Sequence, residues 1–119
     1  MNKIEEVLNR YIQGTYQADL TLLQSVFHPG ARMSGFLGGE LILGTPEPFF
    51  QDLGSRPSMQ SEHVPYQARI LSISQAGKIA SAVLLEEHFF GALSMETHFE
   101  LLKLEEGWQI IAKNFTELN

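Results

Sequence analysis

The 119-residue sequence predicts an α+β fold in which a curved antiparallel sheet packs against helices on one face. Two observations predict this class. Apolar residues recur at helical spacing in the first third, whereas long β-branched and apolar segments joined by short turns fill the second half. A helical start followed by consecutive antiparallel strands is typical of α+β domains. At this length we expect a single domain spanning residues 1–119.

The first half predicts three helices. Apolar residues at i, i+3, i+4, i+7 and i+8 make residues 4–16 an amphipathic helix. Asp19 is a suitable N-cap for a second helix over 20–27, which the Pro29-Gly30 pair should end. The Thr45-Pro46 pair predicts the start of a third helix. The expected apolar stripe of the first helix is Ile4, Val7, Leu8, Tyr11 and Ile12.

The remaining segments predict strands and loops. Residues 31–36 and 39–44 should form a short hairpin, and the polar segment 54–65, with two prolines, should form a long mobile loop. The expected long strands cover residues 66–74, 79–90, 95–105 and 108–118.

The turn before Trp108 decides which side chains share a face of the sheet. A two-residue loop, at 105–106 or 106–107, places Trp108 on the face of the odd-numbered residues of the preceding strand. A three-residue loop would reverse the two faces. With the two-residue loop, one face carries Met95, Thr97, Phe99, Leu101, Trp108, Ile110, Ala112 and Asn114. The other carries His98, Glu100, Leu102, Leu104, Ile111, Lys113 and Phe115.

Both faces are largely apolar, so both need a cover. One face would pack on the helices, and a second copy of the chain is the simplest cover for the other. We therefore expect a homodimer through the outer sheet face.

Composition excludes several classes of function. The net charge of −6 argues against nucleic-acid binding, which needs a basic patch. The absence of cysteine excludes disulfides and thiolate metal sites. No apolar run approaches the roughly 20 residues of a membrane span, and the N-terminus does not resemble a secretory signal. These features predict a cytoplasmic protein that contacts neither nucleic acid nor membrane.

Two sets of residues are candidates for acid–base chemistry. His28 either reaches a pocket as an acid, base or ligand contact, or caps the end of the second helix. Glu86 and His88 should share one side of a strand, where a carboxylate beside an imidazole can act as a general base. The alternative for this pair is an exposed strand end.

The other histidines suggest no site. His98 and Glu100 should lie on the outer face, where Glu100 can pair with Lys113, and His63 should be solvated in the loop. No histidine pair has the i, i+4 spacing of a helical metal site, and no glycine-rich phosphate loop is present. We expect neither a metal nor a cofactor.

Aromatic and apolar residues are better candidates for ligand binding than for catalysis. They could line a cavity for a flat, mostly apolar molecule, although each alone could equally be ordinary core. These residues are Tyr16, Met33, Phe36, Phe50, Tyr66, Phe90, Phe99 and Trp108.

Several segments together resemble the nuclear transport factor 2-like superfamily, which includes SnoaL-like and ketosteroid isomerase-like proteins. Within it they resemble the lumazine-binding branch. The segments are YIQGTYQAD, LLQSVFHPGARM, ILSISQAGKIASAV and FELLKLEEGWQIIAKNF, and the similarity runs over residues 4–117. The resemblance implies a cone in which a curved sheet and helices enclose an apolar pocket, and a homodimer through the sheet. Because relatives include isomerases, dehydratases, cyclases and binding modules, it does not fix an activity.

Thr97 departs from the pattern of that branch, which commonly has an aspartate at this inward position. A threonine can hydrogen-bond a ligand but cannot act as a base at neutral pH. Thr97, and Asn114 on the same predicted face of the sheet, are therefore further candidates for contacts with a ligand.

The sequence thus predicts a homodimeric protein that binds a small apolar ligand. Two alternatives remain: an isomerase, cyclase or dehydratase that uses His28, Glu86 or His88, and a dimeric interaction module without a ligand.

Overall fold

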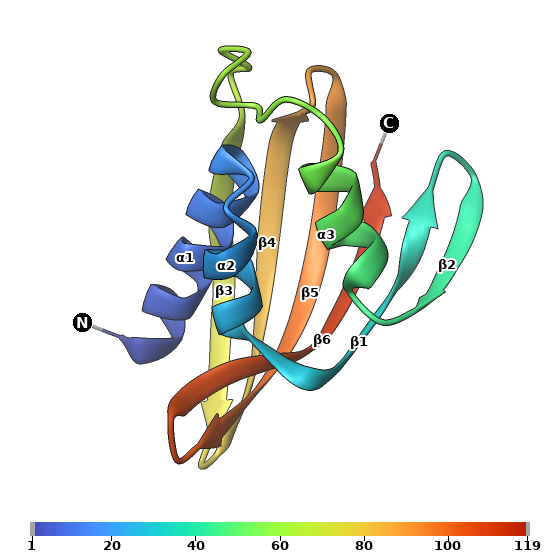
Figure 1. The fold of residues 1–119 in the computed structure, drawn as a ribbon. Coiled ribbons are helices and arrows are strands. Elements are labelled where there is room, and N and C mark those ends of the chain that lie inside the picture. The colour runs from blue at the N-terminus through green and yellow to red at the C-terminus, as the bar shows by residue number, and fades with distance from the viewer. Residues whose placement is uncertain (1, 119) are drawn as a thin grey trace.

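The computed structural model describes residues 2–118, which form three helices and one six-stranded sheet (Figure 1). The α+β class is confirmed. The helices are α1 (Lys3–Gln17), α2 (Leu20–Val26) and α3 (Glu47–Gly54). The strands are β1 (Phe27–Leu37), β2 (Glu40–Gly44), β3 (Gln67–Ala76), β4 (Ile79–Phe89), β5 (Leu93–Leu104) and β6 (Gly107–Glu117).

Helix α2 begins at Leu20, as the sequence predicts, whereas α1 begins one residue before its predicted start and α3 one residue after it. The Asn2 side chain accepts hydrogen bonds from the backbone N–H groups of Ile4 and Glu5, at 2.8 and 3.2 Å. The Asp19 side chain accepts one from Leu22 at 3.0 Å, which confirms it as the N-cap of α2. These caps satisfy backbone donors that the first turn of a helix leaves free.

The sheet is open and mixed, with the order β2-β1-β6-β5-β4-β3. Four neighbouring pairs are antiparallel, but β1 runs parallel to β6, so the prediction of a wholly antiparallel sheet is wrong. Pro29 and Gly30 also lie within β1 and not in a loop after α2. A parallel partner far along the chain leaves no local signal in the sequence, because no tight turn joins the two strands.

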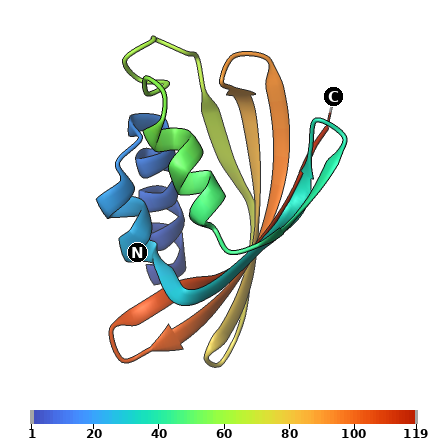
Figure 2. The same ribbon diagram turned by 45° about the vertical axis from the view of Figure 1, so that its right-hand side comes forward.

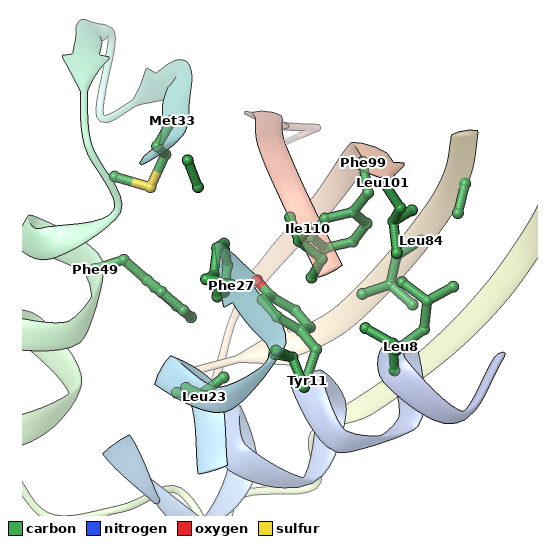
Figure 3. Packing of buried hydrophobic residues seen from close by; sticks show 14 of the residues in the cluster. Leu8, Tyr11, Leu23, Phe27, Met33, Phe49, Leu84, Phe99, Leu101 and Ile110 are labelled. Carbon is green, nitrogen blue, oxygen red and sulfur yellow. The ribbon is translucent and has the colours of Figure 1, made fainter. Parts of the chain in front are cut away.

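All three helices lie on the concave side of the curved sheet (Figure 2). Tyr11 points from α1 into the layer between helices and sheet (Figure 3). Its ring centroid lies 4.9 Å from that of Phe99 on β5 and 5.8 Å from that of Phe49 on α3. Four of the five residues in the predicted stripe of α1 are buried, and Ile12 is partly buried.

The segment over residues 54–65 is irregular, as predicted, but it is fixed to the rest of the molecule. Met59 is fully buried, and its sulfur accepts a hydrogen bond from the Phe90 N–H at 3.2 Å. The Gln60 N–H donates to the Tyr16 carbonyl at 3.0 Å. This segment therefore contacts both the end of α1 and the end of β4.

A bulge in β6 decides which residues face the helices. Leu104 pairs with Gly107, which confirms a two-residue turn at 105–106. The register then shifts, because Leu101 pairs with Ile110 whereas Glu100 pairs with Ala112, and Ile111 is the additional residue. One inserted residue moves every later side chain to the other face.

The predicted faces of β6 are therefore correct before the bulge and wrong after it. Lys113 and Phe115 are buried on the concave side, whereas Asn114 is exposed on the convex side. The predicted Glu100–Lys113 pair is consequently absent. Glu100 accepts a hydrogen bond from the Ser81 hydroxyl instead, at 3.1 Å.

Within residues 2–118, no helix is both long enough and apolar enough to cross a membrane.

Candidate ligand cavity

A cavity of about 200 Å³ lies between α3 and the concave side of the sheet. It exceeds the roughly 150 Å³ at which an apolar protein cavity holds benzene. Its wall is mostly apolar. The apolar lining residues are Met33, Leu37, Ile42, Pro48, Phe49, Phe89, Met95 and Phe115, and the polar ones are Asp52, Arg56, Glu86, Thr97 and Lys113.

Glu86 reaches the cavity because it continues the inward alternation of β4. Its side chain is only 2% exposed. The Tyr66 hydroxyl donates a hydrogen bond to one carboxyl oxygen at 2.6 Å, and the Thr97 hydroxyl donates a weaker one to the other at 3.5 Å. Burial raises the pKa of Glu86, against the opposing effects of the Lys113 charge and these two hydrogen bonds.

Lys113 reaches the cavity from β6 and is 6% exposed. Its Nζ lies 3.4 Å from the centroid of the Phe49 ring and about 5 Å from two other rings, at 5.3 Å from Tyr11 and 5.4 Å from Phe115. Among the ion pairs of the described residues, none includes Lys113. Burial lowers the pKa of Lys113 to about 8, although the charge of Glu86 opposes this shift.

Two tyrosines complete a polar cluster, which we define as Tyr11, Tyr66, Glu86, Thr97 and Lys113. Burial raises the pKa of both tyrosines well above the ordinary value, and the charge of Glu86 raises it further. Within the described part of the chain, the buried Tyr11 hydroxyl has no hydrogen-bond partner. Both tyrosines are therefore neutral donors at physiological pH.

Asp52 and Arg56 supply charges to the cavity from α3 and the residues after it. They form an ion pair at 2.8 Å, and both side chains are exposed. The Arg56 guanidinium also lies 3.4 Å from the centroid of the Phe90 ring. These contacts place Phe90 beside the cavity without making it a lining residue.

Of the residues that the sequence singles out, the structure brings Met33, Glu86 and Thr97 together in the cavity lining. Tyr66 touches this group through its hydrogen bond to Glu86. The other aromatic candidates on the concave side pack elsewhere. Tyr16 stacks on Tyr66 at 5.8 Å, Phe50 packs on Phe27 at 5.4 Å, Phe99 packs on Tyr11 at 4.9 Å, and Trp108 is core.

The two histidine candidates do not line the cavity. His28 lies in β1, where its Nδ1 accepts a hydrogen bond from the Gly30 N–H at 2.9 Å, so it does not cap the end of α2. A bulge after Glu86 gives His88 a left-handed backbone (φ 56°), and its Nδ1 lies 3.1 Å from the Gly91 carbonyl oxygen. The prediction that Glu86 and His88 share a side is therefore wrong.

Phe36 and Asn114 lie on the convex side of the sheet. Phe36 is 51% exposed, and the Asn114 side chain accepts a hydrogen bond from the Ser34 hydroxyl at 3.1 Å. The convex His98 pairs with Glu96 at 2.7 Å. The expected inward position of Asn114 is wrong because of the β6 bulge.

The sequence pattern does not indicate Lys113 or Tyr11 as members of the polar cluster. In that pattern Tyr11 is only one apolar member of a helical stripe. One feature of the sequence does single out Lys113. It is the only charged residue between Ile110 and Phe115, where the other residues are apolar except for the amide Asn114. That signal does not reveal the face, because the face depends on the bulge.

The chain was compared with protein families, curated proteins and solved structures. The family model described as "Putative lumazine-binding" matches residues 1–116. No curated protein matches. A structure of an NTF2-like protein of unknown function from Methylobacillus flagellatus has 26% identity and a TM-score of 0.86, and the match covers 98% of this chain and 90% of that one.

Other structures extend the likeness. An NTF2-like protein of unknown function from Shewanella baltica has 27% identity and a TM-score of 0.85, with coverage of 98% and 92%. A ketosteroid isomerase-like protein from Erwinia carotovora has 15% identity and a TM-score of 0.70, with coverage of 98% and 95%, and it supports the fold alone. Because the family model spans nearly the whole chain and these folds agree, the chain belongs to the NTF2-like family described as "Putative lumazine-binding".

Proposed function

We propose that this protein binds a small, mostly apolar, ring-containing ligand in the cavity. The observation that carries this proposal is the convergence of Glu86, Thr97 and Lys113 on one apolar cavity. Ligand sites typically combine apolar walls with a few polar groups that fix orientation. The family description, "Putative lumazine-binding", supports a small ring-containing ligand.

The polar cluster is held in a defined arrangement before any ligand enters. Tyr66 and Thr97 each donate a hydrogen bond to Glu86, so the carboxyl group is fixed. Lys113 lies against the Phe49 ring and retains donors for a ligand oxygen or nitrogen. A ligand would therefore contribute an acceptor toward Lys113 and place its ring against the apolar wall.

Native mass spectrometry of freshly purified protein tests ligand binding. We expect the chain to carry a small molecule whose mass is lost on denaturation. The variant Met33→Trp, which fills the cavity, should lose this mass, whereas Leu71→Trp, on an exposed position of β3, should keep it. Equal ligand mass on both variants would contradict binding in this cavity.

A second candidate function is proton-transfer catalysis, as in an isomerase, cyclase or dehydratase. Its support is the pair of opposite pKa shifts at the cavity, upward for Glu86 and downward for Lys113. Shifts of this kind bring an acid and a base closer to neutral pH. We place this role on Glu86, because His28 and His88 lie outside the cavity lining.

Deuterium exchange separates catalysis from binding alone. The co-purified ligand, returned to the protein in D₂O, should gain deuterium at a carbon position if Glu86 moves a proton to and from it. Glu86→Gln should abolish this exchange while the ligand still binds. If the wild-type protein binds the ligand without exchange, simple binding is supported and catalysis is not.

We also propose that the protein is a homodimer. Three exposed apolar side chains support this proposal: Phe36, Leu41 and Leu43, at 51, 58 and 71% exposure, lie on the convex side of the β1–β2 hairpin. If the chain dimerises but carries no ligand, the interaction-module alternative gains support. Cytoplasmic location stays a prediction from the sequence.

A further inference from the structure

We propose that Lys113 is a nucleophile that forms a reversible imine with a small aldehyde or ketone bound in the cavity. This inference rests on the proposed ligand-binding function and names a substrate class for the same site. It starts from the position of Lys113, whose amine lines an apolar cavity and makes no ion pair among the described residues.

The surroundings of Lys113 differ from those of a structural lysine. A buried lysine is ordinarily paired with a carboxylate, because an unpaired buried charge is costly. Here the contacts of Nζ are the ring faces of Phe49, Tyr11 and Phe115, which partly stabilise the ammonium ion without accepting its proton. The amine can therefore lose its proton without breaking an ion pair.

The charged groups around Lys113 act in opposite directions. Glu86 on β4 favours the ammonium form, and the ion-paired Asp52 and Arg56 line the same cavity. Tyr11 is neutral. Burial exceeds these effects and lowers the pKa of Lys113 to about 8, so at pH 8 about half of this amine is unprotonated.

An ordinary lysine with a pKa of about 10.4 is only roughly 0.4% unprotonated at the same pH. The unprotonated, nucleophilic fraction of Lys113 is therefore about 100-fold larger. The other lysines of the chain, Lys3, Lys78 and Lys103, are exposed. Reactivity should therefore concentrate at Lys113 and not at the surface.

The reaction balances without an oxidant or reductant. The Nζ lone pair attacks the carbonyl carbon, a C–N bond forms, and the carbonyl oxygen takes up a proton to give a carbinolamine. The nitrogen then loses a proton, its lone pair forms the C=N bond, and the C–O bond breaks with release of water. In both steps Glu86, which lines the same cavity, is placed to take the proton that the nitrogen loses and to return it to the oxygen.

Reductive trapping with benzaldehyde tests this inference on the full chain. Protein at pH 8 is incubated with benzaldehyde, and borohydride then converts any imine to a stable secondary amine. Peptide mapping should find one benzyl group on Lys113, formed at least about 10-fold faster than on Lys78, because the larger unprotonated fraction outweighs the weaker nucleophilicity of a less basic amine. The N-terminal α-amino group also reacts at this pH, and the peptide map separates it.

Two variants and one ligand analogue make the outcomes distinct. Lys113→Arg keeps the charge and should lose the cavity adduct, whereas Lys103→Met, an exposed site on β5, should keep it. Benzyl alcohol cannot form an imine, and its binding is followed by ligand-observed NMR. If benzyl alcohol binds, with competition by the co-purified ligand, but Lys113 reacts no faster than Lys78, the imine proposal is overturned and cavity binding stands. If no ring compound binds the wild-type protein, either as purified or after the co-purified ligand has been removed, the proposed function itself fails.

Discussion

A hydrogen bond of 2.6 Å from Tyr66 holds the Glu86 carboxyl in the cavity wall. Removing the donor in Tyr66→Phe should destabilise the ionised carboxyl and raise the pKa of Glu86 further. The cost should be about 1–3 kcal/mol at pH 8 and less at pH 4, where the carboxyl is protonated and needs the donor less. Urea unfolding at both pH values measures the difference.

Tyr16→Phe is the matched control for this prediction. Tyr16 stacks on Tyr66, but the side chains that hydrogen-bond Glu86 are Tyr66 and Thr97, so Tyr16→Phe removes a hydroxyl of the same kind without touching Glu86. Its loss should change stability by less than about 0.5 kcal/mol at either pH. Equal effects of the two variants would show that Tyr66 acts through ring packing and not through Glu86.

Lys113 should make the stability of the protein depend on pH in the alkaline range. The pKa of the folded lysine is about 8, against an ordinary 10.5, so the unfolded chain binds more protons between these values. Stability should therefore rise as the pH increases from about 8 to 10.5, by about 3 kcal/mol in total. Unfolding curves across this range measure the slope.

In Lys113→Met the alkaline rise should disappear, and the unfolding free energy at pH 7 should increase by about 1–3 kcal/mol, because a buried charge is replaced by an apolar chain of similar length. Lys103→Met should leave the rise intact. A persistent rise in Lys113→Met would assign it to another group.

At this scale the sequence could predict only part of the site. Glu86 was visible as a carboxylate in an apolar strand, and Thr97 as an inward position. Regular alternation places Lys113 on the outer face, which is wrong, because a single inserted residue, Ile111, reverses the alternation of β6. A bulge of this kind depends on packing against neighbouring strands, which the local pattern does not report.

Close approach between β1 and β6 constrains these two strands. Gly35 pairs with Phe115, and an added Cβ at Gly35 would clash with the Phe115 carbonyl oxygen and lie 2.6 Å from its ring carbon Cδ1. Gly35→Ala should therefore destabilise the protein by at least about 2 kcal/mol and disturb the cavity wall that Phe115 forms. Thermal unfolding and ligand occupancy by native mass spectrometry measure the two effects.

Ser34→Ala is the neighbouring control in β1. It removes the exposed hydrogen bond to Asn114, and its cost should stay below about 1 kcal/mol. If Gly35→Ala is no more harmful than Ser34→Ala, the two strands can separate to admit a methyl group and the close approach is not a constraint.

The helices and the antiparallel strands could be predicted because their signals are local. Periodicity and the Asp19 cap define α1 and α2, and short turns join β3 to β6 in succession. The parallel position of β1 could not be predicted in this way. Its partner is the last strand of the chain, and no adjoining turn fixes their register.

For the whole molecule, the convex apolar patch of Phe36, Leu41 and Leu43 should mediate association. Light scattering after size-exclusion chromatography should give twice the chain mass of 13.4 kDa. Leu43→Glu should shift the protein toward monomer because a charge in an apolar contact is costly. Leu71→Glu, on β3 at the opposite edge of the sheet, should not. A monomeric wild-type protein would contradict the dimer.

The position of β6 between β1 and β5 has a consequence for synthesis of the chain. On the ribosome, β1 can pair with β2 at once but lacks its other neighbour, β6, until residues 107–117 have been made. The cavity wall is also incomplete until β6 has been made, since Lys113 and Phe115 both belong to that strand. Contacts between the two ends of a chain form slowly because a long loop must close first. The proposed ligand cavity is therefore incomplete until β6 has been made, and a bound ligand can stabilise the fold only after that point.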